Sequence, residues 1–301
     1  MSEGCTHDCS TCSENCSSKQ GGAPTFEKTN DLSRIKKTIA VVSGKGGVGK
    51  SLVTSLLAVN MNRAGKHSAI LDADITGPSI PKLFGIHEKA LGNEDGILPC
   101  KSKTGIDVMS INLLLENDTD PVVWRGPVIA GTVKQFYTDV IWRDVDFMFV
   151  DMPPGTGDIQ LTLSQQVPLT GAVVVTTPQD IALIDAKKGL RMFQKVNVPI
   201  LGIIENMSVF ICPHCGEVEH IFGEGGAKRM SEQYGVPLLG ELPLSAKIRE
   251  QADSGLPTVA AEPDGKEALM YREMAMKVAG ALARITKDYT AKMPGIRVVN
   301  D

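Results

Sequence analysis

Residues 44–51 have the composition and spacing of a phosphate-binding loop. They fit the pattern G-x-x-x-x-G-K-[ST], in which glycines allow backbone N–H groups to turn toward phosphate oxygens. In such a loop, Lys50 reaches the β- and γ-phosphates of a nucleotide and the Ser51 hydroxyl ligates Mg²⁺. A glycine-rich turn without a ligand is the alternative, but an apolar strand precedes this run and an apolar helix follows it. We therefore predict nucleotide contacts from Gly44, Lys45, Gly46, Gly47, Val48, Gly49, Lys50, Ser51 and Leu52.

Three aspartates stand directly after apolar runs that read as strands. Asp72 and Asp74 follow one run, and Asp151 follows another. Acidic residues at the carboxyl ends of sheet strands lie in the crevice where ligands bind. Asp151 is expected to hold Mg²⁺ through water, and the glycines of the following Met-Pro-Pro-Gly-Thr-Gly run can move when the γ-phosphate leaves.

Six of the seven cysteines fall into two close groups, and in a reducing compartment such groups hold metal more often than disulfides. Cys100 stands alone and is expected to be a buried strand residue without a role. The group nearest the N-terminus has the spacing C-x3-C-x2-C-x3-C, which suits a [4Fe–4S] cluster or Zn²⁺. The alternative is a disordered tail whose thiols bind metal only adventitiously. The groups are Cys5, Cys9, Cys12 and Cys16, and the pair Cys212 and Cys215.

The Cys-Pro-His-Cys run at 212–215 supplies half of a tetrahedral metal site. Three completions are open: His214 or His220 of the same chain, the N-terminal cysteines, or the same run of a second copy across a twofold axis. The residues alone leave zinc and an iron–sulfur cluster near parity as the metal.

An alternation of strands and helices must position these groups. From Ser33 onward the pattern predicts an α/β fold, a mostly parallel doubly wound sheet with helices on both faces. Residues 1–30 are expected to form a cysteine-rich tail, 31–290 a P-loop ATPase domain with an insertion at 209–222, and 291–301 a second tail. Strands are expected at 39–43, 67–71, 147–151, 172–176, 199–204 and 238–241, and a hairpin at 97–111.

Helices are expected at 50–63, 127–141, 180–195, 245–253 and 264–288, with a further helix that opens at 223–226 and ends near 234. Along the last helix, apolar residues at helical spacing are expected to pack in the core: Leu269, Met270, Met274, Val278, Ala281, Leu282 and Ile285.

Composition excludes several classes of partner. The chain has 301 residues, 42% of them hydrophobic, and a net charge of −4, which argues against nucleic-acid binding. No stretch approaches the roughly 18 apolar residues that span a membrane, and the proline-broken ending at 293–301 is too short for a membrane-surface helix. The N-terminus is polar rather than a signal peptide, so we expect a cytoplasmic protein.

A second lysine, Lys45, follows the first glycine of the loop. The run Gly-Lys-Gly-Gly-x-Gly-Lys-Ser resembles the deviant Walker A loop of dimerising ATPases, which include MinD, the nitrogenase iron protein and the Mrp/ApbC scaffolds. This resemblance implies a MinD-like fold of the SIMIBI class and a homodimer in which Lys45 reaches the partner's nucleotide.

The run from Asp72 to Pro81, Asp-Ala-Asp-Ile-Thr-Gly-Pro-Ser-Ile-Pro, narrows the resemblance to the Mrp/ApbC family. It implies that Asp74 orients the attacking water, beside the catalytic Lys45 and Lys50, and that Asp72 supports the Mg²⁺ shell. An aspartate that only caps a turn or helix is the alternative.

The chain lacks the Asn-Lys-x-Asp sequence with which related GTPases read guanine, so adenine is the expected base. By resemblance, Asn206 contacts the base, and the main chain near Pro243 packs on its other side. A strand-end asparagine that caps a turn is the alternative for Asn206.

The same family carries Cys-x-x-Cys after an Asn-Met-Ser element, as here, and bridges a labile [4Fe–4S] cluster between subunits. The resemblance therefore favours the twofold completion of the cysteine site and an iron–sulfur cluster, with a permanent zinc staple as the alternative. Some relatives also carry an N-terminal four-cysteine cluster site, with wider spacing than in this chain.

The predicted function is that of an ATP-hydrolysing carrier of a [4Fe–4S] cluster, with slow hydrolysis coupled to cluster loading or transfer and with apo iron–sulfur proteins as acceptors. A regulatory ATPase of the MinD/ParA type, with a structural zinc site bridging the dimer, is the main rival. A reductase like the nitrogenase iron protein is the third, although its cluster cysteines sit singly in two separate places.

Overall fold

The phosphate-binding loop follows strand β1 (Arg34–Ser43), which lies in the middle of a parallel sheet. A computed structural model describes residues 26–117, 122, 124 and 126–285. Within these residues the sheet has nine strands, in the order β10-β9-β8-β1-β7-β2-β6-β5, and β11 pairs with β9. The remaining strands are β2 (Ser68–Asp72), β5 (Cys100–Lys101), β6 (Asp107–Met109), β7 (Asp144–Asp151), β8 (Gly171–Thr176), β9 (Ile200–Ile211), β10 (Val218–Glu219) and β11 (Leu238–Leu244).

The pairing is parallel except at the short strands β5 and β10. Because parallel neighbours end at the same edge, the residues that follow β1, β2 and β7 come together there. Asp72 and Asp151 are direct partners in the β2–β7 register. A separate hairpin joins β3 (Leu91–Asn93) to β4 (Gly96–Leu98).

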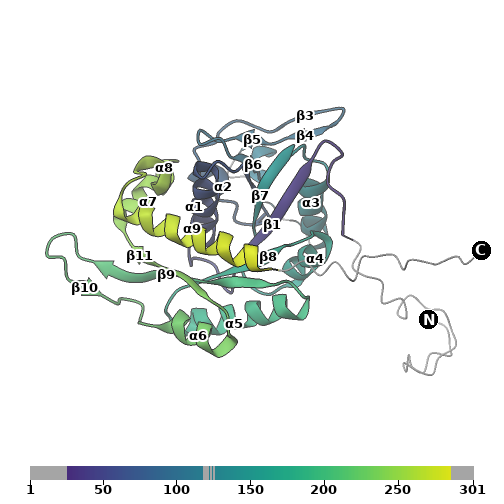
Figure 1. Ribbon diagram of the computed structural model, residues 1–301. Helices are drawn as coiled ribbons and strands as arrows, with labels where there is room; N and C mark the ends of the chain where they lie inside the picture. Colours follow the sequence, from purple (N-terminus) through teal and green to yellow (C-terminus); the bar gives the residue numbers. More distant parts are fainter. Residues whose placement is uncertain (1–25, 118–121, 123, 125, 286–301) are drawn as a thin grey trace, which may run out of the picture.

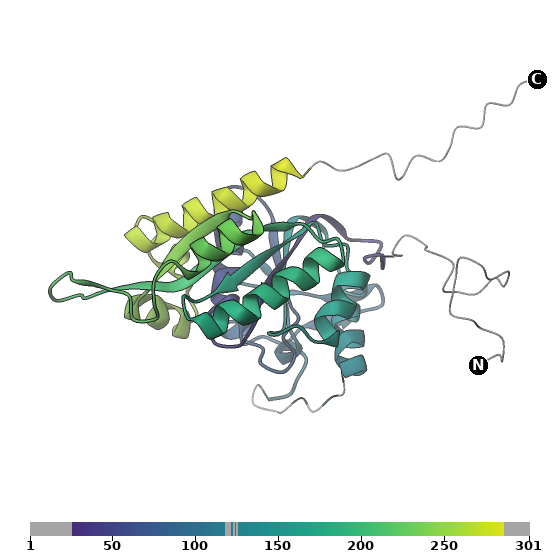
Figure 2. The ribbon, with the colours of Figure 1, turned by 90° about the horizontal axis from the view of Figure 1, so that it is seen from below.

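Helices cover both faces of the sheet (Figures 1 and 2). Alternate residues of β1 enter two different apolar cores: Ile39 and Val41 face one, and Ala40 and Val42 face the other. The first core lies under α1 (Lys50–Arg63), α2 (Ile80–Leu83), α7 (Ala246–Asp253), α8 (Thr258–Ala261) and α9 (Lys266–Arg284). The second lies under α3 (Gly126–Thr138), α4 (Asp158–Gln166), α5 (Asp180–Lys195) and α6 (Gly226–Tyr234).

The predicted fold class is confirmed, and α1 and α5 have the predicted bounds. The hairpin predicted at 97–111 is present as β5 and β6, with a turn closed by the bond from the Ser102 amide to the Ile106 carbonyl. Short helices α2, α4 and α8 and the β3–β4 hairpin were not predicted. Strand β9 runs to Ile211, well past its predicted end at 204.

The predicted core stripe of the last helix is partly wrong. Leu269 and Met270 are 39% and 38% exposed, whereas Ala268 and Tyr271 are buried together with Met274, Val278 and Leu282. The helix is rotated relative to the prediction because the small Ala268 and the large Tyr271 face the core.

Candidate functional site

The backbone of the loop after β1 is shaped by glycines. Gly47 and Gly49 have φ of 80° and 84°, a left-handed region that side chains other than glycine rarely adopt. A Cβ atom on Gly46 or Gly47 would meet nothing within 4 Å, so this side of the loop is open. A Cβ on Gly44 would instead lie 2.2 Å from the backbone carbon of Asp185, because the loop packs directly on α5. The loop is therefore held from one side and open on the other, as a phosphate cradle requires.

A pocket of about 320 Å³ opens over this loop. The predicted residues Lys45, Gly46, Gly47, Gly49, Lys50, Ser51 and Leu52 line it together with Asp74. Gly77, Ser79 and Pro154, from the segments after β2 and β7, complete the wall. The structure thus brings the loop and the two predicted acidic segments to one pocket.

Asp151 is the centre of a buried polar cluster beside this pocket. Lys50 Nζ lies 2.8 Å from Asp151 Oδ2, and the Ser51 hydroxyl donates to the same oxygen at 2.6 Å. The Thr54 hydroxyl donates to Asp151 Oδ1 at 2.7 Å. Thr54 was missed by the sequence analysis, although it lies one helical turn after Lys50 and so shares its face of α1.

Asp72 and Asp74 face the same lysine. Lys50 Nζ lies 3.8 Å from Asp74 Oδ2. The Ser110 hydroxyl donates to Asp72 Oδ2 at 2.9 Å, and the Asp74 amide donates to Asp72 Oδ1 at 3.2 Å. Asp72 therefore closes a local turn, as the capping alternative proposed, while its carboxylate stays within the acidic cluster.

Burial raises the pKa of Asp72 to about 8, and the neighbouring Asp151 charge adds to the increase, while Lys50 and Ser110 oppose it. Burial also raises the pKa of Asp74, against the attraction of Lys50. Three carboxyl groups thus share one lysine, and this excess of acidic groups and oxygen donors suits a hard divalent cation. With the Ser51 hydroxyl, this donor set fits Mg²⁺.

Lys45 does not join this cluster. Its Nζ donates to Gln179 Oε1 at 3.5 Å, at the start of α5. Two large apolar side chains stand exposed on the first turns of that helix, Ile181 at 69% and Ile184 at 54%. The second lysine of the loop therefore lies near an exposed apolar helix face.

Asn206 lies behind the loop rather than at the mouth of the pocket. Its side-chain amide is buried and donates to the Val48 carbonyl at 3.0 Å, and a Cβ on Gly49 would lie 2.2 Å from its Nδ2 atom. Pro243 is half-buried on β11, paired with Val209 of β9. Contact of Asn206 and Pro243 with a base stays a prediction.

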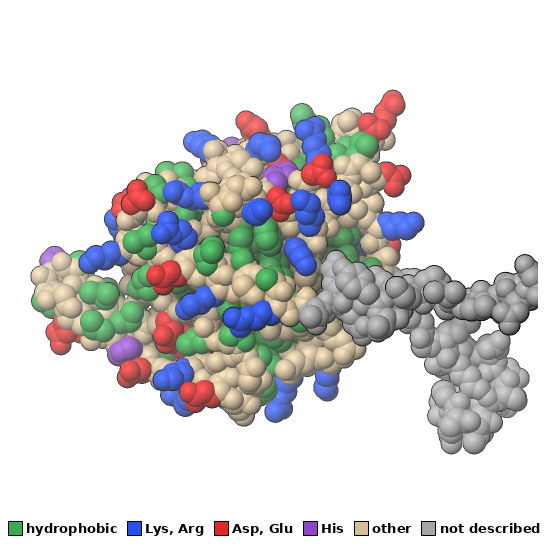
Figure 3. All heavy atoms as spheres, in the orientation of Figure 1, with side chains coloured by type: hydrophobic (Ala, Val, Ile, Leu, Met, Phe, Trp, Pro, Cys, Tyr) green, Lys and Arg blue, Asp and Glu red, His purple; other side chains and the backbone are tan. Residues whose placement is uncertain are grey.

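Cys212 and Cys215 lie at the tip of an arm formed by β9 and β10, which extends away from the body (Figures 1 and 2). The Cys212 amide donates to the Glu217 carbonyl at 2.9 Å, and the Gly216 amide donates to the Cys212 carbonyl at 2.9 Å. Figure 3 shows apolar side chains on this arm, and Ile211, Val218 and Ile221 are each more than half exposed.

Hydrogen bonds at the tip favour the ionised form of the Cys212 thiol. Backbone N–H groups of Cys215 and His214 donate to its sulfur and, with the Cys215 thiol, lower its pKa. A lowered pKa favours the thiolate, which is the form that binds metal. Cys215 is exposed, and both cysteines are free thiols.

His220 is placed away from the two cysteines. Val218 pairs with Ile211 and Glu219 with Phe210, so His220 follows at the base of the arm, where its Nδ1 contacts the Ser208 carbonyl at 3.2 Å. Among the described residues, no three His, Cys, Asp or Glu side chains are grouped to hold a metal. Cys5, Cys9, Cys12 and Cys16 lie outside the described residues. The twofold completion stays a prediction.

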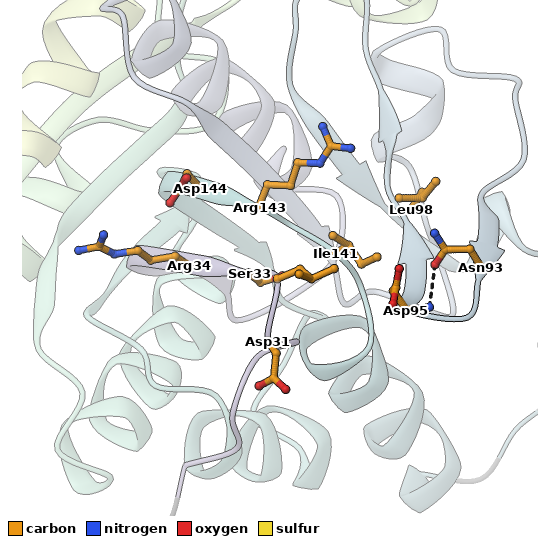
Figure 4. A pocket seen from close by; sticks show the side chains of 10 residues that line it. Asp31, Ser33, Arg34, Asn93, Asp95, Leu98, Ile141, Arg143 and Asp144 are labelled. Atoms are coloured by element: carbon orange, nitrogen blue, oxygen red, sulfur yellow. Dashed lines mark hydrogen bonds between the residues drawn. The ribbon is translucent and has the colours of Figure 1, made fainter.

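A second pocket, of about 620 Å³, lies at the opposite, amino ends of the strands (Figure 4). Arg34 and Asp144, the first residues of β1 and β7, line it with Asp31, Asp95 and Arg143. It contains none of the predicted site residues, and its charges of both signs do not select one class of ligand.

Two further expectations can be compared with the structure. Cys100 is buried on β5, as predicted, and donates to the Glu88 carbonyl at 3.5 Å. Within the part of the chain that the structure describes, no helix has the length and apolar character needed to cross a bilayer.

Comparisons with known proteins agree with this geometry. Residues 34–279 match the protein-family model described as ParA, NUBPL iron-transfer P-loop NTPase. The chain is 51% identical over 248 residues to the iron-sulfur cluster carrier protein of Pseudomonas fragi, covering 81% of this chain and 86% of that protein.

Solved structures with the same fold include a nucleotide-binding protein from Archaeoglobus fulgidus in complex with ADP. It is 40% identical, with a TM-score of 0.68, over 78% of this chain and 91% of that one. The cell division ATPase MinD of Pyrococcus furiosus is 23% identical, with a TM-score of 0.59, over 81% of this chain and 98% of that one; at this identity the likeness concerns the fold alone.

Proposed function

Because the chain belongs to the NUBPL iron-transfer P-loop NTPase family of the ParA group, we propose that it is an ATP-hydrolysing carrier of iron–sulfur clusters. The cargo is a [4Fe–4S] cluster held by Cys212 and Cys215, and the acceptors are apo iron–sulfur proteins. The observation that carries the proposal is the presence, in one chain, of a P-loop pocket and a pair of free cysteines, of which Cys212 is half-buried and Cys215 is exposed.

The nucleotide end of the proposal assigns roles to residues of the pocket. Loop amides and Lys50 bind the ATP phosphates, and Ser51 and Asp151 hold Mg²⁺ with Asp72 in support. When bound, Mg²⁺ neutralises charge on the β- and γ-phosphates. Asp74, buried at the pocket wall, orients the attacking water.

The cargo end is proposed to require two chains. One arm supplies two thiolates, and a [4Fe–4S] cluster is held by four. A twofold axis through the arm tips would place a second Cys212 and Cys215 opposite the first. The exposed Ile181 and Ile184 beside Lys45 supply an apolar face for the same dimer and bring Lys45 toward the partner's nucleotide.

Hydrolysis is proposed to be slow and to alter how firmly the cluster is held. Such coupling is reciprocal, so nucleotide must change cluster affinity and cluster must change nucleotide affinity. We further propose that residues 31–290 form the ATPase domain and that residues 1–30 carry a second metal or cluster site.

The test is transfer of a reconstituted [4Fe–4S] cluster to an apo acceptor such as apo-aconitase, under anaerobic conditions, with and without MgATP. We expect MgATP to change the transfer rate of the wild-type protein and to leave Lys50→Ala unchanged. Equal transfer rates for wild type and Lys50→Ala, each with and without MgATP, would refute the coupling. They would not exclude cluster binding by the cysteines.

A permanent zinc site bridging the dimer is the second candidate, favoured by the Cys-Pro-His-Cys-Gly tip, where N–H groups donate to the Cys212 sulfur. Metal analysis of anaerobically purified protein separates the two. Iron with equimolar sulfide supports the carrier, and zinc alone supports the structural site.

A further inference from the structure

Strand β9 connects the nucleotide pocket with the cysteines directly. Its Asn206 donates to the Val48 carbonyl of the loop, and six residues later the chain reaches Cys212 at the tip of the arm. The Asn206 amide is buried against Gly49, so a movement of the loop must displace it. Figures 1 and 2 show β9 leaving the body as one leg of the arm.

Between these two points β9 contains a bulge. Glu241 pairs with Glu205 and Pro243 with Val209, so two steps along β11 correspond to four along β9. The extra residues fall within 206–208, and Met207 has φ of 57°. A non-glycine residue in this left-handed region is strained and persists only where its surroundings enforce it.

Contacts on either side of Met207 enforce this conformation. The Glu205 carboxylate is buried and accepts from the Ala227 amide of α6 at 2.7 Å. The same carboxylate accepts from the Ser208 hydroxyl at 2.5 Å. The Ser208 carbonyl contacts His220 Nδ1 at 3.2 Å, so the bulge is also tied to the returning leg of the arm.

We propose that the bulge at 206–208 is the joint that transmits nucleotide occupancy of the loop to the cysteine arm, with Met207 and His220 as its positioning residues. The proposal deepens the carrier function above and rests on it. Before the bulge, β9 is held by β8 and β11. Beyond it β8 no longer pairs with β9, β11 pairs only with Val209 and Phe210, and β10 pairs with Phe210 and Ile211. A displacement of Asn206 therefore passes through Met207 to the less constrained side.

The identity of residue 207 then determines how much motion reaches the arm. A methionine at positive φ is confined to one small allowed region of φ and ψ. A shift of the peptide before Met207 therefore moves the peptide after it. Glycine populates many conformations and would absorb that shift. Met207→Gly should therefore uncouple the arm without removing a contact to nucleotide or metal.

The experiment measures iodoacetamide alkylation of Cys212, by mass spectrometry of its peptide, in the full-length cluster-free reduced protein. Rates are compared with and without saturating Mg²⁺ and a non-hydrolysable ATP analogue, whose binding is measured in the same samples. Because the readout needs no cluster, its result is independent of whether the carrier function holds. Asn197→Gly is the matched control, since Asn197 also has positive φ, 59°, but lies exposed between α5 and β9.

The nucleotide ratio is the ratio of the Cys212 alkylation rates with and without nucleotide. We expect nucleotide to change this rate by about fivefold or more in wild type and Asn197→Gly. In Met207→Gly the change should be less than about 1.5-fold, at unchanged nucleotide affinity. A wild-type alkylation rate that nucleotide does not alter would overturn the proposal. So would a nucleotide ratio in Met207→Gly equal to that of wild type, or a nucleotide ratio in Asn197→Gly reduced as much as in Met207→Gly.

Should Met207→Gly fail to fold, His220→Ala decides, because His220 is exposed and its removal cuts the contact with the Ser208 carbonyl. It also removes a 3.9 Å contact with the exposed Glu224, so Glu224→Gln is measured beside it and should keep the wild-type response. The nucleotide ratio of His220→Ala is expected to fall at least about twofold below that of wild type. An unchanged ratio would refute the joint.

Discussion

The Ser51 hydroxyl donates to the Asp151 carboxylate at 2.6 Å and thereby joins the first turn of α1 to the end of β7. The two residues are 100 positions apart in the sequence, and the parallel pairing of β1 and β7 brings them together. Lys50 and Thr54 contact the same carboxylate, so direct contacts join the loop and helix α1 to Asp151, the predicted Mg²⁺ ligand.

Replacement of Asp151 by asparagine should therefore separate Mg²⁺ binding from folding. The introduced side-chain amide would keep a hydrogen-bond acceptor for Ser51 but would lose the charge that holds the metal. We expect ATP hydrolysis by Asp151→Asn to fall by about 100-fold or more, measured as phosphate release at saturating MgATP. Thr132→Val, which removes an exposed hydroxyl on α3, is the control. Hydrolysis at the wild-type rate would exclude Asp151 from the metal site.

The raised pKa of Asp72 predicts a specific dependence of stability on pH. A carboxyl whose folded pKa, about 8, exceeds its unfolded value of 3.8 is protonated more in the native state. Its contribution to stability is full below about pH 4 and is lost as the pH rises through about 8.

Asp72→Asn resembles the protonated carboxyl and does not titrate. Thermal unfolding without nucleotide or metal should therefore show the variant gaining stability relative to wild type as pH rises from about 5 to about 9. A pH-independent difference in Tm would show that Asp72 is ionised throughout.

The exposed α5 face predicts where two copies meet. Ile181→Glu and Ile184→Glu place charge on side chains that are 69% and 54% exposed, so the folded chain should tolerate them while a dimer buries the charge at high cost. We expect sedimentation with MgATP to show monomers for these variants and dimers for wild type.

Met276→Glu is the matched control, because Met276 is 65% exposed but lies on α9. A dimer that survives both α5 substitutions, or one lost equally in Met276→Glu, would place the interface elsewhere.

The packing of Gly44 against α5 predicts a stability effect that is separate from ligand binding. A methyl group there would overlap the Asp185 backbone, so Gly44→Ala should lower the free energy of unfolding by about 1–3 kcal/mol. Gly131→Ala, inside α3 with nothing within 4 Å of the added methyl, should instead raise it by about 0.5–1 kcal/mol. Denaturant unfolding measures both changes. If the two substitutions changed the free energy of unfolding equally, the loop would be shown to shift enough to accommodate a methyl group at residue 44.

The sequence allowed the loop, the order of most elements and the acidic strand ends to be predicted, because each is encoded by neighbouring residues. Lys50 and Ser51 are recognisable from their spacing to glycines alone. The partners Thr54, Ser110 and Gln179 were not predicted, because their contacts depend on how distant segments pack.

Strand β9 shows the same limit. Its apolar run ends at Ile204, so the polar Glu205 and Asn206 read as a strand end. In the structure these polar side chains are satisfied by the Ala227 amide and the Val48 carbonyl, which allows the strand to continue to the cysteine arm. The phase of α9 was misjudged for a related reason, since Ala268 carries too little apolar surface to mark a core position.

The most direct test is the metal content of anaerobically purified and reconstituted protein, expressed per chain and combined with oligomeric state. The carrier predicts one [4Fe–4S] cluster per two chains at Cys212 and Cys215 of a dimer, which is about two iron atoms and two sulfides per chain in addition to any metal that residues 1–30 bind. That cluster should be absent from Cys212→Ser/Cys215→Ser, present in Cys100→Ser and retained after deletion of residues 1–20. A protein that stays monomeric and contains zinc without iron or sulfide, or one whose full cluster survives loss of both arm cysteines, would contradict it.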